Sequence, residues 1–172
     1  MTQKEILFET IDILNSLNLK YWIAGGTLLG IVREGIFLSN DTDIDIGIFF
    51  SQSGAIDSHI ITKFQEKNYE LYKHNIMECY SFYKESTWNI DLWTLVKENE
   101  NYWHYGWSGK FIFPNECLDS LDIIKWEGRE IYVPHNPEKY LECLYGINWK
   151  TPQQMKKPND YSNYKGLDNA NG

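Results

Sequence analysis

Residues 43–48 read Asp-Ile-Asp-Ile-Gly-Ile, and this alternation of acidic and aliphatic residues decides the fold. Alternate residues of a β-strand share a face, so the pattern predicts a strand over 43–50 with its isoleucines in the core. Asp43 and Asp45 then lie on the opposite face, roughly 6.5–7 Å apart along the strand. Two carboxylates held that close repel each other unless a cation lies between them, and an all-oxygen site favours Mg²⁺ or Mn²⁺. The alternative is the solvated acidic face of a half-exposed strand.

Two glycines precede this strand, after a short apolar run that predicts another strand. They are Gly25 and Gly26, and Thr27 follows them. Adjacent glycines allow backbone amides to approach an anion closely, and a helix over 28–34 capped by Thr27 would direct its positive end there. These three residues are therefore candidate phosphate ligands, and an ordinary strand-to-helix turn is the alternative. The spacing does not fit the GxGxxG fingerprint of dinucleotide-binding folds.

A third carboxylate lies in a later apolar segment. Residues 88–95 read Trp-Asn-Ile-Asp-Leu-Trp-Thr-Leu, so Asp91 is the only charge of a strand with two largely apolar faces, which predicts a central place in a sheet. Burying a lone carboxylate costs several kcal/mol unless a metal, a cation or hydrogen bonds compensate it. A position facing Asp43 and Asp45 would explain it. The alternative is a solvated side chain near the end of the strand.

Hydrophobic periodicity gives the remaining elements and the fold class. It predicts further helices over 3–17, 53–67 and 137–144, strands over 69–74, 78–84 and 88–96, and hairpins at 103–113 and 122–133. Helices and strands in this order predict an α+β domain, with a mixed central sheet flanked by helices. We expect a single domain over residues 1–152 and a polar C-terminal tail over 153–172.

Composition excludes several classes of protein. The 172 residues carry 16 Lys and Arg against 24 Asp and Glu, a formal charge of −8, which argues against a sequence-independent nucleic-acid partner. The sequence contains no apolar run of about 18 residues, so we expect no transmembrane segment. Its 3 cysteines form no CxxC pair and indicate reduced thiols, which favours a cytoplasmic protein.

Three further side chains are candidates for substrate contacts. Arg33 lies on the helix predicted over 28–34, and its guanidinium suits phosphate geometry. Lys110, beside a glycine-rich hairpin, is a weaker candidate of the same kind. His104 lies in a cluster with Trp103, Tyr105 and Trp107, which could stack on a base or a sugar. The alternatives are a solvated helix charge, a surface lysine and core or rim packing, respectively.

Together these motifs resemble the LicD family of the nucleotidyltransferase (polymerase-beta-like) superfamily. The resemblance is carried by residues 22–37, Trp-Ile-Ala-Gly-Gly-Thr-Leu-Leu-Gly-Ile-Val-Arg-Glu-Gly-Ile-Phe, and by residues 41–47, Asp-Thr-Asp-Ile-Asp-Ile-Gly. The C-terminal part fits as well, with Phe-Pro at 113–114, Trp-Glu-Gly at 126–128, Val-Pro at 133–134 and Tyr-Gly-Ile-Asn-Trp at 145–149. The resemblance covers residues 20–152.

The resemblance implies an enzyme that transfers a phosphorylated group, such as phosphocholine or a polyol phosphate. The donor would be a CDP-activated compound and the acceptor a sugar hydroxyl of a surface glycan. Asp43, Asp45 and Asp91 would hold Mg²⁺ or Mn²⁺, and Asp91 would also accept the proton of the attacking hydroxyl. Two alternatives remain: a nucleotidyltransferase that uses a nucleoside triphosphate to modify a small hydroxylated molecule such as an antibiotic, and a non-catalytic nucleotide-binding module.

Overall fold

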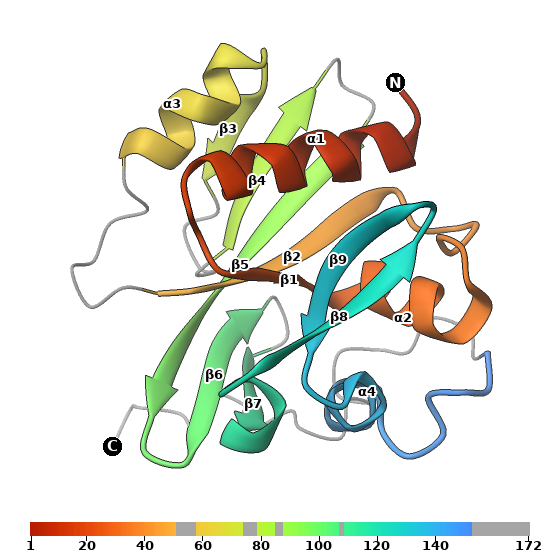
Figure 1. Ribbon diagram of the computed structural model, residues 1–172. Helices are drawn as coiled ribbons and strands as arrows, with labels where there is room; N and C mark the ends of the chain where they lie inside the picture. The colour runs from red at the N-terminus through yellow and green to blue at the C-terminus, as the bar shows by residue number, and fades with distance from the viewer. Residues whose placement is uncertain (51–57, 74–78, 85–87, 107–108, 153–172) are drawn as a thin grey trace.

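The computed structural model describes residues 1–50, 58–73, 79–84, 88–106 and 109–152 (Figure 1). In chain order the elements are α1 (Gln3–Ser16), β1 (Tyr21–Ile23), α2 (Gly25–Glu34), β2 (Asp43–Phe49), α3 (Ser58–Glu66), β3 (Glu70–Lys73), β4 (Cys79–Lys84), β5 (Trp88–Glu98), β6 (Asn101–Gly106), β7 (Gly109–Pro114), the short 3-10 helix η1 (Asn115–Cys117), β8 (Leu121–Trp126), β9 (Arg129–Pro134) and α4 (Pro137–Tyr145). The predicted α+β class with a mixed central sheet is confirmed.

The described strands form one large sheet and one separate ribbon. The sheet follows the order β1-β2-β5-β4-β3, and β6 and β7 extend it from β5. Within it β2 and β5 are parallel, whereas the other neighbours pair antiparallel. Strand β5 is central, between β2 and β4, as its two apolar faces predicted. The ribbon is the β8–β9 hairpin, which turns at Glu127 and Gly128, both with positive φ.

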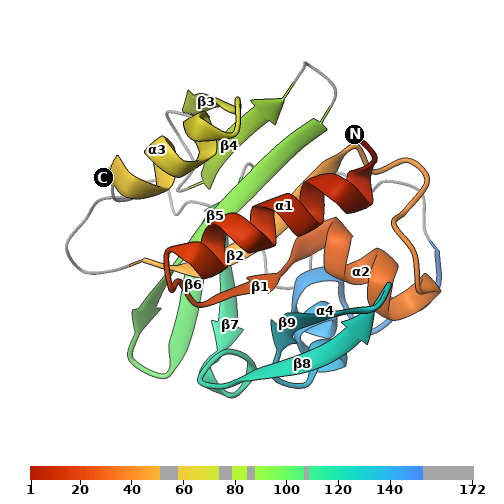
Figure 2. The same ribbon diagram turned by 45° about the horizontal axis from the view of Figure 1, so that its top comes forward.

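Helices α1 and α3 cover one face of the sheet (Figures 1 and 2). The three isoleucines of β2 are buried on this face. Phe64 of α3 stacks on Phe82 of β4, with 4.1 Å between ring centroids, and Lys84 of β4 pairs with Glu9 of α1 at 2.7 Å. Because side chains alternate along a strand, the acidic residues of β2 point away from these two helices.

Aromatic side chains fill the core on the opposite face, towards α4. Trp22 of β1 packs against Phe49 of β2, and Phe49 packs against Tyr102 of β6, with centroid separations of 4.8 and 5.4 Å. Tyr140 of α4 stacks on Phe113 of β7 at 4.6 Å, and both are fully buried. Aromatic residues make up 16% of the chain, and packing of the core explains much of this content.

Some boundaries differ from those predicted. Helix α2 begins at Gly25 with Ala24 as its N-cap, so Thr27 lies inside the first turn. The hydroxyl oxygen of Thr27 accepts the N–H of Asp45 instead of capping the helix. The hairpin expected at 103–113 extends over 101–114. The tail predicted over 153–172 lies outside the described residues, and across the described ranges we find no helix with the length and apolar character needed to span a membrane.

Candidate active site

Two parallel strands bring acidic residues together near the centre of the sheet. The register of β2 and β5 places Asp45 beside Asp91 and Asp43 beside Asn89. Paired residues on adjacent strands lie about 4.8 Å apart and share a face. Asp45 is buried, with 7% of its surface exposed, while Asp43 and Asp91 are partly exposed. The structure thus brings together the three carboxylates that the sequence singles out.

A fourth carboxylate, Asp41, joins this group. One oxygen from each of Asp41, Asp43 and Asp45 lies within 4.8 Å of the other two. Sequence reasoning missed Asp41 because it precedes the strand in a polar loop. The signal was nevertheless present, since Asp41 continues the alternate spacing of the two strand acids by one step. We call Asp41, Asp43, Asp45 and Asp91 the acidic cluster.

Gly25 and Gly26 leave room for the acidic cluster. A Cβ atom at Gly25 would lie 2.1 Å from Asp45 Oδ2, and one at Gly26 would lie 2.2 Å from Asp41 Oδ2. The Gly26 amide donates to Asp45 Oδ2 at 2.7 Å, and the Asp45 amide donates to the buried Thr27 Oγ1 at 3.0 Å. In this structure the three residues therefore orient carboxylates, and their contact with a donor phosphate stays a prediction.

Two polar side chains orient Asp91. Ser81 Oγ donates to Asp91 Oδ1 at 2.5 Å, and Asn89 Nδ2 donates to the same oxygen at 3.0 Å. Ser81 is fully buried on β4, directly opposite Asp91 in the register. Two donors on one oxygen fix the rotation of the carboxylate. Sequence reasoning missed Ser81 because neither strand alone reveals which residues pair.

The acidic cluster concentrates negative charge in a partly buried place. Burial, followed by the charges of the other three acids, raises the pKa of Asp45 well above its ordinary value. Burial and a hydrogen bond with Asp43 raise the pKa of Asp41 to about 8. A divalent cation would offset this repulsion. Carboxylate oxygens from four residues suit Mg²⁺ or Mn²⁺, so the side chains present fit the metal that the sequence implies.

Arg33 does not lie at the acidic cluster. It belongs to the last turn of α2, and seven residues of helix separate it from Gly26 by about 10 Å. Its guanidinium donates to Glu34 and, at 3.3 Å, to the backbone carbonyl of Trp149. Arg33 thus ties α2 to the segment that follows α4, and this position does not support the predicted phosphate contact.

Lys110 lies on the other face of the sheet from the acidic cluster. Its ammonium group sits 4.4 Å from the centroid of the Trp103 ring and pairs with Glu98 at 3.3 Å. Trp103 pairs with Val96, whose position along β5 alternates with that of Asp91, so Trp103 and Lys110 face away from the carboxylates. Its predicted phosphate contact is not supported either.

His104 is a core residue that packs against Trp93. Only 2% of His104 is exposed, and its ring stacks on Trp93 at 4.9 Å with an interplanar angle of 5°. Trp93 follows Asp91 by two residues on the same face of β5. The burial of His104 prevents direct contact with a substrate in this structure, contrary to our expectation. Trp107, the neighbour expected to share its cluster, lies outside the described residues.

The position of His104 leads to a prediction about acid stability. Burial lowers its pKa to about 4, against about 6.5 in an unfolded chain. The unfolded state therefore binds more protons between these values, and His104 destabilises the fold by about 3 kcal/mol as pH falls from above 6.5 to below 4. We expect His104→Phe to remove this part of the pH dependence in urea unfolding, whereas the exposed His135→Gln would retain it. Parallel pH profiles for His104→Phe and the wild type would contradict this assignment.

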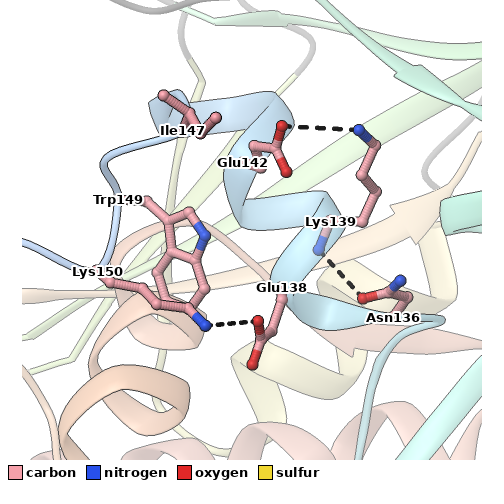
Figure 3. A pocket seen from close by; sticks show the side chains of 7 residues that line it. All are labelled: Asn136, Glu138, Lys139, Glu142, Ile147, Trp149 and Lys150. Atoms are coloured by element: carbon pink, nitrogen blue, oxygen red, sulfur yellow. Dashed lines mark hydrogen bonds and ion pairs between the residues drawn. The ribbon is translucent and has the colours of Figure 1, made fainter.

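A hollow along α4 is a separate feature (Figure 3). Its lining residues are Asn136, Glu138, Lys139, Glu142, Ile147, Trp149 and Lys150, and no member of the acidic cluster belongs to them. Lys150 pairs with Glu138 at 2.7 Å, and Lys139 lies 3.8 Å from Glu142. Since carboxylates neutralise both lysines, we interpret the hollow as a structural feature of α4 and the segment that follows it.

The fold of the chain is that of the nucleotidyltransferase-like domains, as two solved structures show. The lincomycin-bound crystal structure of the lincosamide antibiotic adenylyltransferase LnuA matches with a TM-score of 0.58 and 19% identity, over 82% of this chain and 85% of that one. The solution structure of the antibiotic-resistance factor ANT(2'')-Ia matches with a TM-score of 0.56 and 13% identity, over 92% and 78%. At these identities the likeness shows the fold alone.

Residues 18–136 match the family described as LicD/FKTN/FKRP, nucleotidyltransferase domain, and the chain belongs to this family. The human ribitol-5-phosphate transferase FKTN is 28% identical over 160 residues, which cover 87% of this chain and 33% of that protein. The human ribitol 5-phosphate transferase FKRP is 25% identical over 145 residues, which cover 79% and 29%. The chain thus spans about a third of the length of these relatives.

Proposed function

We propose that the chain is a Mg²⁺-dependent transferase. It moves a phosphorylated group, phosphocholine-like or a polyol phosphate, from a CDP-activated donor to a sugar hydroxyl in glycan synthesis or modification. The observation that carries this proposal is the acidic cluster, four carboxylates gathered beside the first turn of α2. Membership of a family that includes ribitol-phosphate transferases supports the choice of a phosphorylated polyol as the transferred group.

All four carboxylates would help to hold the cation, and Asp91 would also accept a proton. Asp41, Asp43 and Asp45 would hold the cation, and Asp91 would complete the site from β5. When bound, the cation supplies positive charge that offsets the negative charge on the transferred phosphoryl group. The Gly26 amide keeps Asp45 in one orientation. We expect the first turn of α2, with its positive end, to lie beside the donor phosphates.

Asp91 is the candidate general base. Ser81 and Asn89 hold its carboxylate in a fixed orientation on the face shared by the other acids. Asp91 would accept the proton of the attacking hydroxyl as the new oxygen–phosphorus bond forms. The bond to the leaving cytidine monophosphate breaks, and that group leaves with the bonding electrons. The products are a nucleoside monophosphate and a phosphodiester that joins the sugar to the polyol or choline.

The fold likeness to antibiotic adenylyltransferases favours a second candidate. In that reaction a hydroxyl attacks the α-phosphorus of a nucleoside triphosphate, and pyrophosphate leaves. The same acidic cluster would serve, so the geometry alone leaves this candidate in place. Membership of the LicD/FKTN/FKRP family favours the first candidate, transfer from a CDP-activated donor.

Product analysis separates the two candidates. The chain is incubated with Mg²⁺ and either CDP-ribitol, CDP-choline or CTP, in the presence of methyl glycosides as acceptors. We expect release of cytidine monophosphate from a CDP-linked donor, and a loss of at least about 100-fold in Asp91→Asn because general-base catalysis contributes that much. Pyrophosphate release from CTP would support the second candidate, and no product from any of the nucleotides would contradict both.

A further inference from the structure

Four adjacent strands carry a row of side chains across the face that holds the acidic cluster. The registers pair Tyr72 of β3 with Ser81 of β4, Ser81 with Asp91 of β5, and Asp91 with Asp45 of β2. Paired residues share a face, so the four side chains lie on one side of the sheet. The row therefore runs from an aromatic ring at the edge strand to the buried carboxylate at the centre.

A second ring strengthens this aromatic end. Tyr83 of β4 pairs with Asn89, two residues before Asp91, and it shares the face because it follows Ser81 by two residues. The rings of Tyr72 and Tyr83 meet edge to face, with 5.9 Å between centroids. Tyr72 is 52% exposed, so about half of this side chain is accessible to a ligand. We call Tyr72 and Tyr83 the tyrosine pair.

The tyrosine pair lies within reach of the candidate base. Adjacent strands are about 4.8 Å apart, so Tyr72 is about 10 Å from Asp91 across the sheet, with the short Ser81 between them. Burial and the charge of Asp91 both raise the pKa of Tyr83, which places its hydroxyl within electrostatic reach of that carboxylate. Ser81 is fully buried, whereas Tyr83 and Asp91 are partly exposed, so a sugar on the tyrosine pair would approach Asp91 past Tyr83.

The arrangement of the acidic cluster places the donor and the acceptor on different sides of Asp91. The first turn of α2, where the donor phosphates are expected, adjoins β2 through the Gly26–Asp45 hydrogen bond. Asp91 lies on the next strand, β5, and the tyrosine pair lies beyond it on β4 and β3. An acceptor hydroxyl must meet the base on the side away from the donor, because the attacking and leaving oxygens lie in line. That side is the one with the tyrosine pair.

We propose that the tyrosine pair, Tyr72 and Tyr83, is the platform on which the ring of the sugar acceptor lies while its hydroxyl reaches Asp91. The proposal rests on the transferase function proposed above and names the acceptor side of that site. Tyrosine suits this task, since its ring offers an apolar surface to the C–H groups of a sugar and its hydroxyl offers a polar partner. Tyr72, at the exposed edge, would govern the preference among acceptors.

Saturation-transfer NMR on the full chain tests the proposal. The probes are the methyl glycosides of glucose, galactose, N-acetylglucosamine and N-acetylgalactosamine, added to protein with Mg²⁺ and CDP. We expect at least one glycoside to receive saturation, Tyr72→Ala to weaken its binding about tenfold, and Tyr72→Phe to retain most of it. Tyr132→Ala serves as the matched control, because Tyr132 is a partly exposed tyrosine on β9, outside the sheet that holds the site.

Separate measurements distinguish the failure of this proposal from the failure of the proposed function. Binding of CDP with Mg²⁺ and the melting temperature are recorded for every variant, and we expect Tyr72→Ala to leave both unchanged. Glycoside binding that survives in Tyr72→Ala, or that is absent from wild-type protein that binds Mg²⁺ and CDP, overturns the platform and leaves the transferase proposal standing. If the wild type does not bind CDP in a Mg²⁺-dependent way, the transferase proposal itself is overturned.

Discussion

Asp45→Asn is expected to abolish transfer while leaving the metal-free fold at least as stable as the wild type. Loss of a metal ligand removes several kcal/mol of transition-state stabilisation, which corresponds to a rate reduction of about a thousandfold or more. The fold should tolerate the change because the side-chain oxygen of asparagine can still accept the Gly26 amide. The buried carboxylate also faces three like charges, which the neutral amide relieves.

The two readouts for Asp45→Asn are the transfer rate with Mg²⁺ and the melting temperature in chelator. We expect the melting temperature to stay constant or to rise by about 2–4 °C, which corresponds to about 1 kcal/mol for a chain of this size. Asp122→Asn is the matched control, since Asp122 is a half-exposed carboxylate on β8 that pairs with His135. Retention of more than a tenth of the transfer rate in Asp45→Asn would contradict its role.

Gly25→Ala is expected to destabilise the fold by about 3 kcal/mol or more, through two separate effects. Gly25 has a φ of +47°, a conformation that costs a residue with a side chain about 1–2 kcal/mol. The added methyl group would also lie 2.1 Å from Asp45 Oδ2, so the carboxylate must move. We expect urea unfolding to report the lost stability and the transfer assay to report the displaced carboxylate.

Gly35→Ala separates these two effects. Gly35 ends α2 with a φ of +75°, but apart from its chain neighbours and its own helix, no atom of the described residues lies within 4 Å of a Cβ atom placed there. This variant should therefore show the backbone cost of about 1–2 kcal/mol alone, with the transfer rate unchanged. Equal losses of stability in Gly25→Ala and Gly35→Ala, with transfer intact in both, would show that the close approach to Asp45 has no functional consequence.

The sequence predicted the centre of the site because that part depends on local alternation. Asp43 and Asp45 share a face wherever a strand forms, and the apolar flanks of Asp91 require a central strand. Once both strands are in one sheet, parallel pairing places Asp45 and Asp91 side by side. The same alternation extends to Asp41, which the prediction left out because Asp41 lies before the first residue of the strand.

The sequence could not predict the residues that support the site, because these depend on strand register. Ser81 reaches Asp91 only because β4 pairs with β5 at that position, and nothing within either strand specifies the pairing. Trp103 and His104 adjoin in sequence and suggested a single cluster, yet consecutive residues of a strand face opposite ways. His104 accordingly stacks in the core on Trp93, and Trp103 contacts Lys110 on the other face.

Titration with Mn²⁺, followed by electron paramagnetic resonance of the free ion, tests most directly whether the acidic cluster is a divalent-cation site. In the presence of CDP we expect the wild type to remove Mn²⁺ from the free pool at a stoichiometry of one or two ions per chain, with Mg²⁺ competing. Asp45→Asn should leave the ion free over the same range, while Asp122→Asn behaves as the wild type. Equal binding by the wild type and Asp45→Asn, or no binding by either, would contradict the account.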